Sequence, residues 1–285
     1  MEPLESHVLF VRKDGLFEVG TIDQSDGKYV QTQAPTADFS PDWTHVVAVG
    51  PHILFVRKDG LFAVGHIDQK TGHYAETDGA AGAFSSPLFS PDWSHVVAVG
   101  PHVLLVRNSD GRFEVGHIDE STRKYVQTWS DISGFTDSAH VVAAGPHILF
   151  VRDDGLYAVG HINLSTGKFV TTDSGKLTDT DGTVFTGVTH VVAAGSRVLL
   201  GSNDEFWVLH IDEATSKIVP TQNLGRGVGG TPNPIHVVAV GPHVLGVSPT
   251  QALGYVMHFD NLGQVVETQS GPPFASDWSH VVAVA

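Results

Sequence analysis

Six histidines recur along the chain at nearly equal intervals, and each opens a similar phrase, HVVA. Their spacings are 50, 45, 50, 46 and 44 residues. Imidazole nitrogen is a good ligand for Zn, Cu, Ni or Fe. A ring of such side chains would therefore suit a transition-metal centre in a metalloprotein or a metal-dependent enzyme. The six are His45, His95, His140, His190, His236 and His280.

A structural role is the alternative for the same histidines. A metal centre needs three or four ligands rather than six equivalent ones. Most repeats also carry an Asp in a later turn, at Asp14, Asp59, Asp110, Asp154 and Asp204. A His–Asp hydrogen bond in each repeat would tie neighbouring segments together. We therefore expect a structural network and no cofactor, with the transition-metal site as the competing hypothesis.

An Asp-Trp pair precedes three of the six HVVA phrases. The pairs lie in FSPDW (39–43), FSPDW (89–93) and FASDW (274–278), at the ends of variable segments. An indole face can stack on the apolar C–H face of a sugar while a carboxylate accepts hydrogen bonds from its hydroxyls. In the alternative, each Trp fills a gap between structural units. The predicted ligand-binding residues are Asp42, Trp43, Asp92, Trp93, Asp277 and Trp278.

Repeating β structure must position these residues. In the second repeat, four short apolar runs follow one another: HVVAVG (45–50), HILFVR (52–57), LFAVGHID (61–68) and HYAET (73–77). Turns containing Gly, Pro or Asp separate them, as in β-hairpins. A longer, variable segment follows the fourth run. Four strands per repeat, with a period between forty and fifty residues, are typical of a β-propeller.

The lengths of the connections predict the strand order. A Gly-Pro turn can join only neighbouring strands, whereas the passage from the rim of one blade to the axis of the next covers roughly 14 Å. HVVAVG is then the innermost strand. The first repeat (7–44) lacks such a strand, and the final HVVAVA (280–285) begins no repeat of its own. We expect this last strand to complete blade 1 and to close the ring, which removes exposed sheet edges.

The predicted fold is therefore all-β. It is a six-bladed β-propeller of four-stranded antiparallel blades, closed by the C-terminal strand, in a single domain covering residues 1–285. Blade 1 comprises residues 7–44 and 280–285. Blades 2 to 6 begin near residues 45, 95, 140, 190 and 236.

Composition narrows the choice of partners. The net charge of −15, from 16 basic and 31 acidic residues, argues against nucleic acid, because phosphate binding needs a basic footprint. No apolar run approaches the roughly 20 residues of a transmembrane helix. The start, MEPLESHVLFV, is acidic and does not resemble a signal peptide. Without cysteine the chain has no disulfide, and the compartment is left open.

Two hairpin sequences resemble those of a known lectin family. The runs ILFVRKDGLFAVGHI (53–67) and ILFVRDDGLYAVGHI (148–162) are similar to the hairpins of tachylectin-2-like and tectonin-type propeller lectins, over about a dozen residues per blade. Those lectins bind N-acetylated amino sugars in pockets repeated around the ring. The resemblance implies a propeller that binds glycans.

The similarity among blades 1 to 4 favours a multivalent binding protein. Repeated sites gain avidity when they stay alike, whereas one central active site gains nothing from alike blades. We predict a lectin-like, carbohydrate-binding propeller with its sites in the blade-connecting loops and with no assigned catalytic residue. The alternatives are a metal-dependent enzyme or metalloprotein that uses a histidine-lined channel, and a protein-interaction scaffold.

Overall fold

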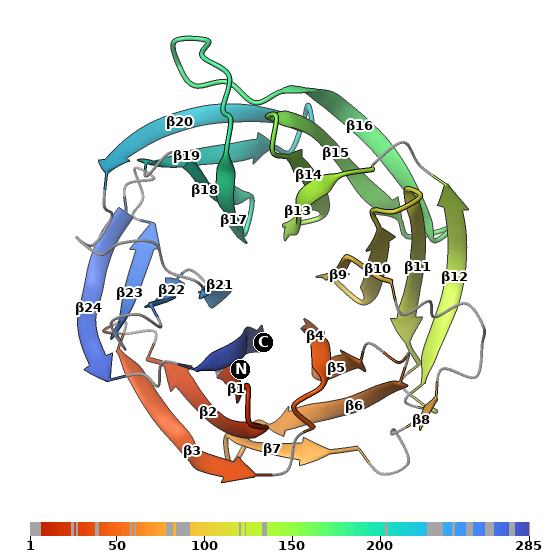
Figure 1. The fold of residues 1–285 in the computed structure, drawn as a ribbon, viewed down its shortest axis with the longest axis vertical. Helices are drawn as coiled ribbons and strands as arrows, with labels where there is room; N and C mark the ends of the chain where they lie inside the picture. The colour runs from red at the N-terminus through yellow and green to blue at the C-terminus, as the bar shows by residue number, and fades with distance from the viewer. Residues whose placement is uncertain are drawn as a thin grey trace.

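Six four-stranded antiparallel sheets stand in a ring around a central axis, as the computed structural model shows (Figure 1). The predicted six-bladed β-propeller is confirmed. The C-terminal strand β25 (Trp278–Val284) pairs with β1 (His7–Arg12), so the ring closes as predicted. No helix among the described residues is long and apolar enough to cross a membrane.

The structure describes most of the chain. The described residues are 7–23, 26, 28–37, 40–57, 59, 61–77, 82–83, 92–119, 121–122, 124–132, 136–202, 205–226, 236–240, 243–248, 253–259, 265–273 and 277–284. Asp204 lies outside them, as do parts of the segments between blades. His236 is described in its backbone alone.

In blades 2 to 6 the strands follow the chain from the axis to the rim, and in blade 1 the last strand, β25, lies innermost, before β1, β2 and β3. The innermost strands are β4 (Trp43–Val49), β9 (His95–Val99), β13 (Ser138–Ala144), β17 (Val188–Ala194), β21 (His236–Val240) and β25. The second strands are β1, β5 (His52–Arg57), β10 (His102–Arg107), β14 (His147–Arg152), β18 (Arg197–Ser202) and β22 (His243–Ser248).

The outer half of each blade has the same regular order. The third strands are β2 (Leu16–Ile22), β6 (Leu61–Asp68), β11 (Arg112–Ile118), β15 (Leu156–Asn163), β19 (Glu205–Asp212) and β23 (Leu253–Phe259). The outermost strands are β3 (Tyr29–Ala37), β7 (His73–Glu76), β12 (Tyr125–Ile132), β16 (Lys168–Lys176), β20 (Lys217–Arg226) and β24 (Val265–Pro273). The short strand β8 (Gly82–Ala83) also pairs with β6.

Four of the inner strands begin two residues earlier than predicted. β4 starts at Trp43 and β25 at Trp278, and in each the register shifts before the histidine. Such an irregularity re-aims the side chains beside it. These two tryptophans therefore belong to the inner strands and not to the connecting loops.

The turn between the first two strands of a blade has the predicted hairpin chemistry. Val49 pairs with His52, which leaves only Gly50 and Pro51 in the loop. Gly50 has φ +56°, a value that suits the first central residue of a two-residue hairpin, and proline accepts the negative φ of the second.

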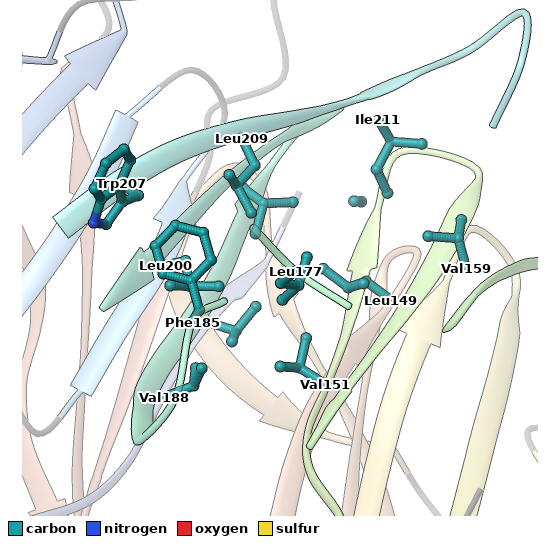
Figure 2. Packing of buried hydrophobic residues seen from close by; sticks show 13 residues of the cluster. Leu149, Val151, Val159, Leu177, Phe185, Val188, Leu200, Trp207, Leu209 and Ile211 are labelled. Carbon is teal, nitrogen blue, oxygen red and sulfur yellow. The ribbon is translucent and has the colours of Figure 1, made fainter. Parts of the chain in front are cut away.

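The hydrophobic core lies between blades and not within any one of them. The second strands have an almost continuous run of buried residues, as in β1 and β5, because both of their faces are covered. Figure 2 shows the interface of blades 4 and 5, where Leu149 and Val151 meet Leu200 and Leu209. Comparable clusters fill the other five interfaces.

The closing strand supplies a testable consequence of this arrangement. Deleting residues 278–285 removes β25, including Trp278, Val282 and Val284, which pack against blades 6 and 2. We expect the truncated protein to lose most of its stability, because two interfaces open together. Thermal unfolding followed by circular dichroism measures this. Cooperative melting within a few degrees of the full-length protein would contradict the assignment.

Candidate functional site

The histidines of the inner strands form hydrogen bonds from blade to blade. The Nε2 atom of His280 lies 3.2 Å from the carbonyl oxygen of Thr44, and that of His95 lies 2.7 Å from the carbonyl oxygen of Ser138. His45 and His140 reach Ser94 and Val188 in the same way, at 3.4 and 3.1 Å. A carbonyl oxygen only accepts, so Nε2 carries the proton. These histidines therefore link the inner strands of successive blades by hydrogen bonds. We call this set of contacts the histidine clasp.

The structural role predicted for these histidines is thus supported, but the predicted partner is wrong. The aspartates of the turns bind arginine instead: Asp59 pairs with Arg57 at 2.7 Å and Asp154 with Arg152 at 3.2 Å. Asp59 and Asp154 also accept backbone N–H groups of their own turns. The histidines take carbonyl oxygens of the next blade because their side chains point around the ring.

The histidine clasp also bears on the metal hypothesis. In His45, His95, His140 and His280 the Nε2 atom is engaged by a carbonyl oxygen. Burial lowers the pKa of His45 and of His95, which favours their neutral form. Among the described residues, no three His, Asp or Glu side chains gather in a group that could hold a metal ion.

The predicted sugar-binding tryptophans occupy wedge positions between blades. Trp93 is 6% exposed and Trp278 is 3% exposed. Trp93 packs with Leu54 and Val56 of the preceding blade, and Trp278 lies 5.2 Å from Phe10, between centroids. A sugar-stacking role needs an exposed ring face, which the structure does not provide at these two positions. Their packing supports the gap-filling alternative.

Trp43 differs, because it is only partly buried and lines two pockets. It packs on Phe55 with 5.4 Å between ring centroids. On one side lies a pocket of about 330 Å³, and on the other a shallower one of about 540 Å³. Pockets of this size suit small ligands. Both members of the predicted pair Asp42/Trp43 line the shallower pocket.

One residue of the third strand explains the difference. The position that faces Phe10 in blade 1 is Glu18, and the equivalent position in blade 3 is Glu114. In blade 2 the same position is Ala63, opposite Phe55. A glutamate fills the space beside the indole, whereas an alanine leaves it open. The 330 Å³ pocket lies at Ala63.

Blades 1 and 2 both contribute to this pocket, which we name the Trp43 pocket. Phe17 and Gln33 come from blade 1, Ser40 from the crossing segment, and Trp43, Ala63, Tyr74 and Glu76 from blade 2. It therefore combines aromatic surfaces with a carboxylate, an amide and a hydroxyl. These groups can stack on an apolar ring face and hydrogen-bond to several hydroxyls.

Two local features hold the walls of the Trp43 pocket in place. Tyr74 lies across Gly65, where a Cβ atom would come within 2.4 Å of its ring. Gln33 accepts a hydrogen bond from the backbone N–H of Tyr74 at 2.8 Å, which ties blade 1 to blade 2. The pocket is thus built on strands and held from both sides, as precise binding requires.

The shallower pocket beside Trp43 contains the predicted carboxylate. It is lined by Pro41, Asp42, Trp43, Thr44, Arg57 and Asp59. Asp42 is exposed, and its backbone N–H donates to the Ser40 hydroxyl at 3.3 Å. Asp42 and Trp43 therefore line one pocket together, and its other lining residues come from the start of β4, the turn before it and the hairpin between β5 and β6.

The other two predicted carboxylates have different surroundings. Asp277 accepts hydrogen bonds from Nε and Nη2 of Arg12 at 3.0 and 2.7 Å. Its carboxylate is therefore engaged within blade 1. Asp92 is exposed beside the buried Trp93, whose ring lies 5.7 Å from the guanidinium carbon of Arg107.

Burying a glutamate beside the tryptophan has an electrostatic cost. Glu114 is fully buried, and neither of its oxygens accepts a hydrogen bond in the structure. Burial raises the pKa of Glu114 to about 7, although the nearby charges of Arg112 and Arg107 lower it in part. Glu18 is better accommodated, since Gln31 and Tyr29 donate to it at 2.9 and 3.3 Å.

Sequence reasoning did not find Gln33, Ala63, Tyr74 or Glu76. The available signal was the comparison of blades: at two equivalent positions blade 1 has Glu18 and Gln31 and blade 3 has Glu114 and Gln127, whereas blade 2 has Ala63 and Glu76. In blade 2 the carboxylate is thus on the outermost strand, and the pocket lies at Ala63, where blades 1 and 3 have a glutamate.

Comparisons with known proteins support the architecture. No family model matches the chain, and no curated protein matches it. Among solved structures, the periplasmic gluconolactonase of Pseudomonas aeruginosa matches with a TM-score of 0.62 and 15% identity, over 98% of this chain and 99% of that one. A protein of Lactobacillus plantarum matches with a TM-score of 0.58 and 14% identity, over 99% and 100%. A chain of a nidogen–laminin complex matches with a TM-score of 0.54 and 9% identity, over 98% of each chain.

Identities this low establish the fold alone. The comparisons support a propeller but not a tachylectin-2-like or tectonin-type lectin in particular, so the lectin function stays a prediction.

The two tryptophan environments predict different mutational costs. W93A removes a buried wedge and should lower the free energy of unfolding by roughly 3–5 kcal/mol. W43A should cost clearly less, because that ring is already half-exposed over a pocket. Urea unfolding of both variants measures the difference, and equal losses would contradict the distinction between them.

Glu114 predicts a pH-dependent stability. Its raised pKa means that the unfolded chain ionises above about pH 4.5 while the folded chain keeps the proton until about pH 7. Stability conferred by the protonated form is therefore lost as the pH rises through that window. E114Q should match the wild type near pH 5 and exceed its unfolding free energy at pH 8, by up to about 3 kcal/mol.

The matched control for this prediction is E18Q, since Glu18 already accepts two side-chain hydrogen bonds. We expect a smaller gain from E18Q at pH 8. Buried histidines change the stability of all three proteins alike, so differences from wild type isolate the glutamate. A gain from E114Q that is the same at both pH values would refute the explanation.

Proposed function

We propose that this protein binds carbohydrate, with its principal site in the Trp43 pocket between blades 1 and 2. The observation that carries the proposal is the position of Trp43, which is partly buried and lines two pockets that together hold Glu76, Gln33, Ser40 and Asp42. An aromatic face bordered by hydrogen-bonding groups is the usual chemistry of sugar recognition.

The arrangement fits a neutral sugar unit better than a charged ligand. The Trp43 pocket exposes a carboxylate and an amide. Among the described residues that line its neighbour, Asp42 and Asp59 lie beside one cation, Arg57. Arg57 is paired with Asp59 at 2.7 Å, and a second carboxylate, Asp42, lines the same pocket. Oxygen acceptors therefore predominate, and sugar hydroxyls can donate to them.

The valency that we propose differs from the three like sites expected from the sequence. In blades 3 and 1 the indoles of Trp93 and Trp278 are buried, and the third strands carry Glu114 and Glu18 where blade 2 has Ala63. The proposal therefore concentrates glycan binding at blade 2. Avidity from several sites on one chain is no longer part of it.

A transplant between blades tests the proposal. The double variant A63E/E76Q gives blade 2 the Glu and Gln arrangement of blades 1 and 3. The new glutamate should therefore fill the Trp43 pocket with a combination of side chains that the ring already accommodates. We expect wild type to retain a set of glycans on an array and the double variant to lose them, with a melting temperature within a few degrees. W43A should lose the same glycans.

The matched control is A158E, the same substitution at the equivalent position of blade 4. It should leave glycan binding unchanged. Calorimetric titration with the best-retained glycan should give one site per chain for wild type. The proposal fails if wild type retains no glycan, or if A63E/E76Q binds as wild type does.

A further inference from the structure

Blade 4 contains a second pocket of about 280 Å³ with different chemistry. It lies on the side of the blade that faces blade 3, and its lining includes Ser138, Phe150, Arg152, Leu156, Ala158 and Ser174. We name it the Arg152 pocket. It shares no residue with the Trp43 pocket.

Two small residues create the Arg152 pocket. Ser138 faces Arg152 across the first two strands, in the register in which Trp278 faces Arg12 in blade 1. Ala158 faces Phe150, as Glu18 faces Phe10. The two large side chains at these positions of blade 1, Trp278 and Glu18, are therefore replaced by a serine and an alanine in blade 4.

Blade 1 shows what the arginine at this position binds. Nε and Nη2 of Arg12 both donate to the carboxylate of Asp277, at 3.0 and 2.7 Å. The same Nη2 also pairs with Asp14 at 3.0 Å. One guanidinium thus holds two carboxylates at once, an arrangement that suits the fixed fork of its N–H donors.

In blade 4 the second carboxylate is missing from the fork. Nη2 of Arg152 pairs with Asp154 at 3.2 Å, as Arg12 does with Asp14. Its Nε is buried and donates no hydrogen bond in the structure. Asp137 has the sequence position of Asp277, but its φ is +63°. Its side chain is exposed and forms no ion pair with Arg152.

We propose that the Arg152 pocket binds a small organic acid. The ligand's carboxylate would take the place on Arg152 that Asp277 takes on Arg12. Its body would lie against Phe150 and Leu156, where Trp278 and Glu18 have no counterpart. The hydroxyls of Ser138 and Ser174 line the same space. The acidic neighbour Asp173 is engaged by the Tyr157 hydroxyl at 2.7 Å, and Asp154 is no obstacle because Arg12 binds two carboxylates in the same way.

Calorimetric titration of the full chain with matched ligand pairs tests this inference. The probes are benzoate against benzamide and D-glucuronate against D-glucose. We expect at least one acid to bind at one site per chain and its uncharged counterpart to bind about tenfold more weakly or worse, as for loss of a charge-assisted hydrogen-bonded pair.

Four variants separate recognition by the guanidinium fork of Arg152 from general attraction of charge. R152Q and R152K should both weaken binding of the acid about tenfold or more, because neither keeps the planar fork. R107Q is the matched control, since it removes the equivalent arginine of blade 3, whose Nε already donates to Asp110 at 2.8 Å. It should leave the affinity unchanged. S138W, which restores the residue found in blade 1, should block the pocket.

Several results would overturn the inference. They are the failure of both acids to bind at millimolar concentration, equal binding of an acid and its uncharged counterpart, and an equal loss of affinity in R107Q and R152Q. Melting curves of the variants exclude unfolding as the cause. The A63E/E76Q variant should still bind the acid, so this inference and the proposed glycan site stand or fall separately.

Discussion

Burial of both faces of every blade is the constraint on which this structure depends. A four-stranded sheet with apolar residues on both sides cannot stand alone in water, and here each face is covered by the next blade. The hydrophobic clusters accordingly draw residues from two adjacent blades each, including the cluster that β25 completes. The histidine clasp adds polar bonds at the same interfaces. Cohesion in this ring is therefore a property of neighbouring pairs of blades.

The interfaces between blades resemble one another near the axis and differ beside the first residues of the inner strands. Near the axis, Val and Ala pack in every blade. In blades 1 to 4, the space beside the start of the inner strand combines a tryptophan or a serine there with a glutamate or an alanine of the third strand. Where Trp and Glu occur together, the space is filled, and burial of the carboxyl group lowers stability, as at Glu114. Where alanine replaces glutamate, space remains. The pockets at Ala63 and Ala158 are such spaces.

The sequence predicted the ring well because its signals are local. Hairpin turns such as Gly50-Pro51 and the spacing of the HVVA phrases fix the strand order without knowledge of other blades. The roles of single side chains could not be predicted in the same way. Whether a tryptophan is exposed depends on the residue at position 63 or 114, on another strand. The histidines bind carbonyl oxygens of the following blade, which no spacing within one repeat reveals.

Comparison of the blades with one another recovers part of what was missed. A repeat protein contains its own reference structures: Nε of Arg12 donates to Asp277, whereas Nε of Arg152 donates no hydrogen bond. Likewise, Glu18 accepts a hydrogen bond from Gln31, whereas blade 2 has Ala63 at the same position. Substitution of a packing residue in one blade costs stability at one interface only, because the other five interfaces are retained. Such a ring can therefore diverge blade by blade, and the positions where alike blades differ are the places to look for function.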